Sequence, residues 1–393
     1  MHRRERYILY IIVIAQFCGT SLWFAGNAIL PELTEEFELG RGAVSNLTSA
    51  VQFGFIVGTL TFALLNIADR FSPSKVFLFS TVLGSISNIL IVVAPLGAVS
   101  LWAYRFGTGF FLAGIYPVGM KIAADWYPGK LGKALGYLVG ALVLGTAFPH
   151  LIRSFAPELA WQEIMWTISG VALTGGFLIY LFVPDGPGRI KTSSIRLGAI
   201  VDIFKVKNFR FASFGYFGHM WELYAFWAFV PVILQIYSET NHLPLPVPLW
   251  SFLIIGSGFF GCVIGGYWAL SRGSAWVAFV QLLLSGICCL FAFLITEFAP
   301  PVFLIFLLIW GITVVGDSPQ FSTLVAHTAP KELIGTALTI TNCIGFSITI
   351  LSIQLLGRIS SHFGLPGTMS MLAIGPVIGL FAVRNLIGRK LTN

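Results

Sequence analysis

The chain has 393 residues, of which 56% are hydrophobic and only 10% are charged, and its formal net charge is +7. Soluble domains are about 45–50% apolar and about 25% charged, and a soluble fold of this length has too little interior to hide so much apolar surface. The composition therefore excludes an ordinary soluble enzyme and indicates a protein that is solvated by lipid hydrocarbon.

A membrane-spanning helix needs roughly 20 consecutive, mostly apolar residues. Twelve segments meet this condition, six before and six after a polar, basic stretch at 184–208. In chain order they are 8–30, 44–66, 76–95, 98–123, 134–155, 162–183, 210–236, 250–271, 275–296, 301–325, 335–356 and 367–388. We predict an all-α membrane protein with two six-helix domains, 1–183 and 209–393, joined by a cytoplasmic basic linker at 184–208.

The placement of lysine and arginine gives this pattern an orientation. If both termini are cytoplasmic, only Arg41, Arg153 and Arg358 lie on the opposite side, and Arg105 and Lys121 lie within the fourth span. The other eighteen of the 23 basic residues are then cytoplasmic, as membrane proteins prefer. We therefore predict a multi-pass protein of the inner (plasma) membrane with both termini in the cytoplasm. The positive charge is read as a topology signal, and no nucleic-acid partner is expected.

The two halves of the chain resemble each other at an offset of about two hundred residues. Residues 114–117 read Gly-Ile-Tyr-Pro and residues 316–319 read Gly-Asp-Ser-Pro, and a further proline follows eleven positions after each, at Pro128 and Pro330. Spans one and seven match more faintly, at Phe17 and Phe217 and at Pro31 and Pro231. This repeat predicts two homologous bundles, and transporters built from repeats bind substrate near the bilayer midplane.

Six plus six spans with a basic central linker resemble the major facilitator superfamily. The loop between spans two and three carries Asp69, Arg70 and Lys75 where the family has an acid followed by basic residues, although Leu65 and Ser72 replace the family's two glycines. The resemblance implies two pseudo-symmetric six-helix bundles and transport by alternating access.

Two further motifs bear on this resemblance. In the fourth span Leu101, Arg105 and the Thr108-Gly109 pair match the family's intramembrane arginine motif. In the fifth span the proton-antiporting drug exporters carry a glycine-proline signature, whereas here the glycines lack an adjacent proline. The first motif supports the resemblance, and the second counts against drug/proton antiport.

Ionisable groups inside a membrane are costly and mark pathways or coupling sites by default. Span seven carries two of them, His219 and Glu222, which are three residues apart and so share a helix face. Histidine titrates near neutrality, and a carboxylate can hold a proton beside it. We interpret the two side chains as a proton-coupling pair; the alternative is a buried hydrogen bond between them that only ties helices together.

Three more ionisable residues lie within predicted spans, and each has two interpretations. Arginine keeps its charge in proteins, so Arg105 needs an anion or carbonyl groups as partners. It either binds an anionic substrate or poises proton transfer, or it is a structural residue bonded to the backbone. Lys121 snorkels to the interface or places a charge in the cavity. Asp317, just before Pro319, partners a cation or bonds the backbone groups that the proline frees.

Other polar residues suit supporting roles. Asp69 and Arg70 are interpreted as a conformational latch, in which the loop acid accepts hydrogen bonds from a helix N-terminus of the other bundle. Polar and aromatic residues within the spans are candidates for the cavity lining, or else packing residues: Trp23, Asn27, Gln52, Tyr116, Trp221, Tyr224 and Asn342. The five cysteines lie in apolar segments with no metal-type spacing, so we expect no disulfide, no metal and no cofactor.

The sequence shows no phosphate-cradling loop and no nucleophile motif, so we predict that the protein is not an enzyme. Three functions remain open. The first is a monomeric, proton-coupled secondary carrier of a small organic or inorganic anion, as a symporter or an exchanger. The second is an exporter of hydrophobic or cationic compounds, with Glu222 and Asp317 as cation partners. The third is a membrane sensor of the same fold that does not transport.

Overall fold

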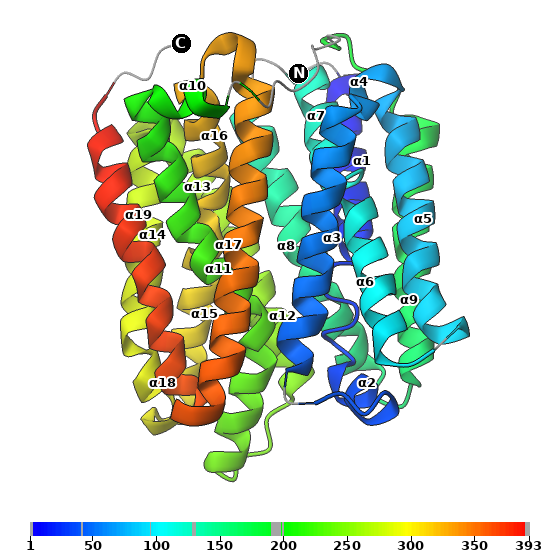
Figure 1. The fold of residues 1–393 in the computed structure, drawn as a ribbon, viewed down its shortest axis with the longest axis vertical. Coiled ribbons are helices and arrows are strands. Elements are labelled where there is room, and N and C mark those ends of the chain that lie inside the picture. The colour runs from blue at the N-terminus through cyan, green and yellow to red at the C-terminus, as the bar shows by residue number, and fades with distance from the viewer. Residues whose placement is uncertain are drawn as a thin grey trace. The chain divides into compact units, whose positions relative to one another are not determined.

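The computed structural model describes residues 3–40, 42–94, 96–127, 131–189, 198 and 200–389. Every regular element in these ranges is a helix (Figure 1). The chain divides into two compact units, Met1–Ser194 and Ile195–Asn393, here called unit 1 and unit 2. Most of the predicted linker, at 190–197 and 199, lies outside the described residues.

Unit 1 contains α1 to α9. Their bounds are α1 (Arg3–Thr20), α2 (Leu30–Glu36), α3 (Ala43–Leu64), α4 (Ile67–Arg70), α5 (Pro73–Val93), α6 (Ala98–Leu112), α7 (Tyr116–Trp126), α8 (Leu131–Phe155) and α9 (Trp161–Phe182). The long helices α3 and α6 pack together, as do α5 and α9, while α1 packs against α8 and α9.

Unit 2 contains α10 to α19 and, among the described residues, the short 3-10 helices η3 to η6. Their bounds are α10 (Ile200–Lys205), α11 (Lys207–Thr240), α12 (Val247–Gly256), α13 (Gly258–Arg272), α14 (Ser274–Phe291), η3 (Ala292–Glu297), α15 (Pro300–Gly316), α16 (Ser318–Thr328), η4 (Lys331–Leu333), α17 (Ile334–Phe363), α18 (Leu365–Met369), η5 (Ser370–Ala373), α19 (Ile374–Val383) and η6 (Arg384–Leu386). The 34-residue α11 packs against α17 and α19.

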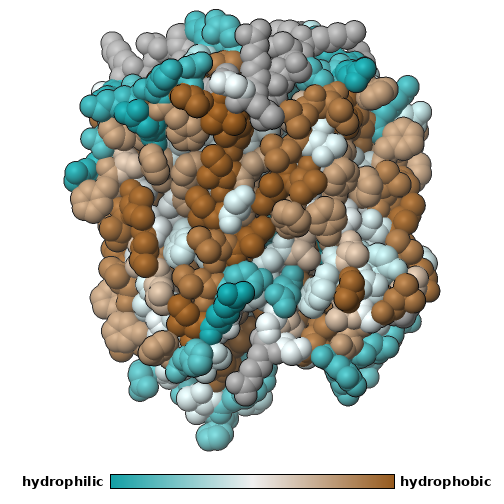
Figure 2. Space-filling model, in the orientation of Figure 1, coloured by the Kyte–Doolittle hydropathy of each residue, from teal (hydrophilic) through white to brown (hydrophobic). Residues whose placement is uncertain are grey.

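The described residues form eleven helical segments that are long and apolar enough to cross a membrane, and a shorter apolar helix at Tyr7–Thr20. The chain is therefore a multi-pass membrane protein, although the predicted count of twelve full spans is not reproduced. On the face shown in Figure 2, hydrophobic side chains predominate along the middle of the helices, and most of the hydrophilic ones gather toward the helix ends.

The first predicted span is wrong as one continuous helix over 8–30. Helix α1 ends at Thr20, residues 21–29 form buried turns, and α2 begins at Leu30. The Thr20 and Ser21 hydroxyl groups donate to the carbonyl oxygens of residues 16 and 18, at 2.7 Å each. Hydroxyl groups that bond nearby carbonyls in this way often bend or end helices.

Spans four and ten are also interrupted, and at matching places in the repeat. Residues 113–115 separate α6 from α7, and Asp317 separates α15 from α16. Pro117 and Pro319 lie in the first turn of the second helix in each case. A proline there needs no N–H bond, whereas it would break the ladder of a continuous helix.

A close contact between helices recurs in both units. A Cβ atom placed on Gly109 of α6 would lie 2.0 Å from the carbonyl oxygen of Val51 in α3. At the matching position of the repeat, a Cβ on Gly311 of α15 would lie 2.1 Å from the carbonyl oxygen of Ile254 in α12. Small residues let membrane helices approach this closely, so the two units use the same device at positions about two hundred residues apart.

Candidate functional site

Helix α11 and the break between α15 and α16 bring together two ionisable side chains in unit 2. His219 Nδ1 lies 2.8 Å from Asp317 Oδ1, and neither side chain is exposed at all. The break puts Asp317 at the start of α16, where Pro319 prevents a continuous helix. The aromatic rings of Tyr216 and Phe321 flank the imidazole, each at 5.9 Å between ring centroids. The pair is thus a titratable contact in a fully desolvated setting.

Glu222 lies nearly one turn along α11 from His219 but makes a different contact. Its Oε1 accepts a hydrogen bond from the indole Nε1 of Trp310 in α15, at 3.1 Å. The Ser285 hydroxyl and the Cys289 thiol of α14 also approach the carboxyl group, which is 1% exposed. The alternative interpretation, a hydrogen bond between His219 and Glu222, is not what the structure shows, because the helix rotation turns the imidazole toward Asp317. Their role as a proton-coupling pair stays a prediction.

The equivalent positions in unit 1 hold no titratable group. Residues 19 and 115, which match 219 and 317, are Gly19 and Ile115, and a Cβ on Gly19 would lie 2.6 Å from Ile115 Cγ2. The same helix contact is therefore made by an aliphatic side chain on a glycine in one unit and by an imidazole and a carboxyl group in the other. The helix contact itself does not require ionisable residues.

Arg105 of α6 lies fully buried in unit 1 and donates to neutral acceptors. Its Nη1 donates to Asn88 Oδ1 at 3.1 Å, and its Nη2 donates to the carbonyl oxygens of Leu22 and Trp23 at 3.1 and 2.6 Å. Those carbonyls belong to the turns that follow α1, so the guanidinium holds the interrupted part of the first span. Its Nε has no hydrogen-bond acceptor among the described residues. The predicted backbone contact is present, and no acid of the described residues lies in an ion pair with the positive charge.

Four of the predicted cavity residues come together near those turns. Trp23 and Tyr116 are in edge contact at 6.4 Å between ring centroids, and Phe55 of α3 lies within 6.5 Å of both rings. Asn27 Nδ2 donates to Thr48 Oγ1 of α3 at 2.9 Å. One turn further along the same face of α3 lies the fourth, Gln52, which is fully buried, and both polar atoms of its amide lack a hydrogen-bond partner among the described residues.

The three remaining predicted cavity residues lie in unit 2 and do not form one cluster. Asn342 Oδ1 of α17 accepts from the Tyr216 hydroxyl at 3.0 Å, beside the His219 ring. Tyr224 packs against Phe346 of α17, with ring centroids 5.2 Å apart. Trp221 donates from Nε1 to the carbonyl oxygen of Met371 at 3.4 Å. Of the three, Asn342 is the one linked to the ionisable pair.

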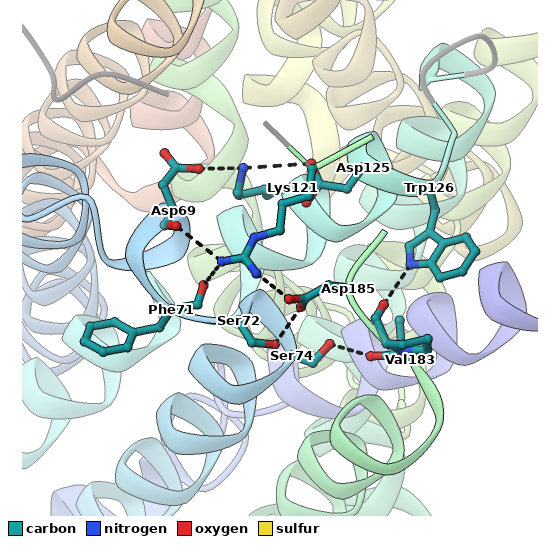
Figure 3. A network of polar contacts seen from close by, with 11 residues as sticks. Asp69, Phe71, Ser72, Ser74, Lys121, Asp125, Trp126, Val183 and Asp185 are labelled. Atoms are coloured by element: carbon teal, nitrogen blue, oxygen red, sulfur yellow. Dashed lines mark hydrogen bonds and ion pairs between the residues drawn. The ribbon is translucent and has the colours of Figure 1, made fainter. Parts of the chain in front are cut away.

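Lys121 and Asp69 belong to a separate polar network at the end of α7 (Figure 3). Lys121 Nζ lies 2.7 Å from Asp69 Oδ1 and 3.8 Å from Asp125 Oδ1. The lysine charge is therefore balanced by two carboxylates of its own unit and does not join Arg105. Asp69 is held by this ion pair, and the adjacent Arg70 is exposed; the predicted latch between the bundles stays a prediction.

The same network holds the chain that leaves α9. Arg189 pairs with Asp185 and donates from Nη2 to the carbonyl oxygens of Asp69 and Phe71, at 3.2 and 2.7 Å (Figure 3). The Ser72 hydroxyl donates to Asp185 Oδ1 at 2.7 Å. Residues 183–189 are thus docked on the loop between α3 and α5.

Sequence reasoning missed several partners of these residues. Asn88, Trp310 and Asp125 were not singled out, although Asn88 is a polar residue in the middle of an apolar span, and this feature would have marked it. Trp310 carries no such signal, because tryptophan is common in membrane helices. Among the described residues no group of three or more His, Cys, Asp and Glu side chains is placed to hold a metal ion.

Part of the sequence is similar to that of known proteins. The chain is 24% identical to the probable galactarate/D-glucarate transporter GarP of Escherichia coli K12 over 217 residues. This match covers 49% of this chain and 47% of that protein. It is also 24% identical to the gentisate transporter of Corynebacterium glutamicum over 42% of this chain and 35% of that protein. The matched part of the chain spans about half or less of the length of these curated relatives.

Solved structures share the fold at low sequence identity. The human organic anion transporter MFSD10 superposes with a TM-score of 0.74 at 14% identity, covering 96% of this chain and 99% of that one. A bacterial homologue of the human lysosomal transporter Spinster, inward-facing and unoccupied, gives a TM-score of 0.69 at 14% identity, with 98% of each chain covered. The sequence model of the Major Facilitator Superfamily matches residues 12–353. With paired helical units, an intramembrane arginine and this match along most of its length, the chain belongs to the major facilitator superfamily.

Proposed function

We propose that the protein is a proton-coupled secondary carrier of a small organic anion that works by alternating access. The observation that carries the proposal is the fully buried contact between His219 and Asp317, with Glu222 nearby on the same helix. Buried ionisable groups are costly in a membrane, and unit 1 makes the equivalent contact without them. Their presence in unit 2 therefore calls for a function other than packing.

The proton step follows from the charges of these three groups. With both carboxyl groups ionised and the imidazole neutral, the site holds two negative charges in a desolvated setting. Like charges that share such a site favour the binding of a proton, which His219 and Asp317 can hold between them at 2.8 Å. Proton uptake lowers the buried charge by one unit, and this change biases the equilibrium between the two access states.

The anion part of the proposal rests on unit 1. Arg105 keeps its charge, is completely buried, and has only neutral acceptors among the described residues. In the same unit, the Gln52 side-chain amide and the Asn27 side-chain oxygen lack hydrogen-bond partners among the described residues. A carboxylate ligand with hydroxyl groups would supply both a counter-charge and partners for these amides. The relatives named for galactarate, glucarate and gentisate transport point to the same class of substrate.

The test is uptake of radiolabelled hydroxylated dicarboxylates and hydroxybenzoates into proteoliposomes, with and without an imposed pH gradient. We expect accumulation only with the gradient in the wild type. Asp317→Asn and Glu222→Gln keep the shape of each side chain, and the glutamine carbonyl can still accept from Trp310. Both variants are expected to lose gradient-driven accumulation while retaining counterflow, the exchange of labelled for unlabelled substrate without a gradient.

Asp202→Asn is the matched control, because Asp202 is an exposed acid of the same unit. Normal gradient-driven uptake in Glu222→Gln would remove Glu222 from the coupling step, and normal uptake in Asp317→Asn would refute the proton site. Uptake of hydrophobic cations in place of anions would favour the exporter function instead. That alternative draws on a 23% identical relative, the chloramphenicol resistance protein of Streptomyces lividans.

A further inference from the structure

One end of unit 2 carries basic side chains that no acid balances among the described residues. This end is defined by the start of α11 and by η6, which meet where Arg389 Nη1 donates to Asn208 Oδ1 at 2.9 Å, and η6 also contacts α14. Five exposed cations lie on the elements that converge here, and we call them the basic rim: Lys207, Arg210, Arg272, Arg384 and Arg389. Within the part of the chain that the structure describes, none of the five forms an ion pair.

The other charges at this end leave the basic rim unbalanced. Asp202 is already paired with Lys205, at 2.8 Å. Lys331 and Glu332 are neighbours in η4 and offset each other. In unit 1, by contrast, Lys121 and Arg189 are held by carboxylates. A general excess of cytoplasmic lysine and arginine explains the number of basic residues but not why five of them gather, without acid partners among the described residues, on elements that converge at one end of unit 2.

Two members of the basic rim, Arg272 and Arg384, each continue an apolar stripe on the outside of a helix. On α13 the exposed side chains Phe260, Ile264 and Trp268 recur every four residues, and Arg272 takes the next position. Residues spaced in this way lie on one helix face. The Arg272 guanidinium lies 5.5 Å from the ring centroid of Trp276, which is in edge contact with Trp268.

The same arrangement recurs on α19. Its exposed stripe runs through Ile374, Ile378 and Phe381, which are 50%, 51% and 59% exposed. Arg384 follows three residues later, and its guanidinium lies 4.7 Å from the centroid of the Phe381 ring. On α11, Lys207 Nζ lies 5.9 Å from the Phe211 ring centroid. Two apolar stripes therefore end at an arginine, and a lysine lies near an aromatic ring at the start of α11.

We propose that the basic rim binds the phosphodiester headgroups of anionic phospholipids, whose acyl chains lie along the apolar stripes. The stripes supply contact area for acyl chains, and the arginine forks match phosphate oxygens. A free phosphate would meet the same guanidinium groups without gaining anything from the stripes. Each basic residue that meets the bound headgroup contributes about five-fold to the affinity for anionic lipid.

The test is native mass spectrometry of the delipidated full-length protein, titrated with dioleoyl phosphatidylglycerol or with dioleoyl phosphatidylcholine. The double variant Arg272→Gln/Arg384→Gln removes the cations that end two stripes. We expect its affinity for the glycerol lipid to fall about 25-fold, the product of two five-fold losses, with little change for the choline lipid. Raising the salt concentration should weaken glycerol-lipid binding by the wild type.

The matched control is Arg70→Gln/Arg358→Gln, which removes two exposed arginines outside the basic rim. The proposal is overturned if the two double variants lose the same affinity, or if both lipids bind the wild type equally. It is also overturned if millimolar inorganic phosphate displaces the lipid completely, since the site would then be a phosphate site without a role for the stripes. The single variants Arg272→Gln and Arg384→Gln give the same comparison should the double variant not fold.

Discussion

Replacing Arg105 by lysine separates the two roles that a buried arginine can have. The substitution keeps the positive charge but loses the planar fork that reaches three acceptors at once. An ammonium group at the end of a shorter side chain can keep one of the bonds to Asn88, Leu22 and Trp23. Two hydrogen bonds to a charged donor are lost, and each is worth about 1–2 kcal/mol in a membrane protein. We therefore expect the free energy of unfolding to fall by about 2–4 kcal/mol.

The assay is reversible unfolding in mixed detergent, followed by circular dichroism, with counterflow measured on the same preparations. Arg358→Lys is the control, because Arg358 is exposed near the end of α17. If the Arg105→Lys protein is less stable but retains counterflow at lower temperature, the positive charge is what substrate transport needs, and the planar guanidinium is what the fold needs. An Arg105→Lys protein that unfolds like the wild type would refute the view that the guanidinium holds the turns after α1.

Three further predictions concern packing, coupling and burial. Gly109→Ala and Gly311→Ala should each lower the free energy of unfolding by about 2–3 kcal/mol, since the added methyl group meets a carbonyl oxygen. Gly170 has open space around it, so Gly170→Ala should be neutral in the same unfolding assay. Trp310→Phe should cost about 1 kcal/mol in stability and reduce gradient-driven uptake more than counterflow, because Glu222 loses its N–H donor. The five cysteine thiols, all buried, should resist a water-soluble maleimide until the protein is denatured, which mass spectrometry would detect.

Sequence reasoning located helices better than contacts. The second and third spans were predicted at 44–66 and 76–95, and the helices are Ala43–Leu64 and Pro73–Val93. Apolar length decides where such helices run, and it is readable in one dimension. The first span failed because its interruption depends on hydroxyl bonds to nearby carbonyls and on Arg105, which lies more than eighty residues away. No local pattern shows that partner.

The site was predicted in the same uneven way. His219, Glu222 and Asp317 were recognised because charge inside an apolar segment is rare, but the contact between His219 and Asp317 was not predicted. Three-residue spacing puts His219 and Glu222 on one face without deciding what that face meets. The rotation of α11 against α15 and α16 makes that decision, and it turns one side chain to Asp317 and the other to Trp310. Tertiary packing of this kind has no signature in a single sequence.

The internal repeat allows equivalent helix contacts in unit 1 and unit 2 to be compared within one chain. The glycine contacts at Gly109 and Gly311 recur in both units because the helices must approach there. The contact of Gly19 with Ile115 does not recur in kind, since unit 2 replaces it with His219 and Asp317. A feature that both repeats share is explained by packing. A feature that one repeat adds at a cost, inside hydrocarbon, requires another reason, and proton transfer is the chemistry that an imidazole and a carboxyl group 2.8 Å apart can perform.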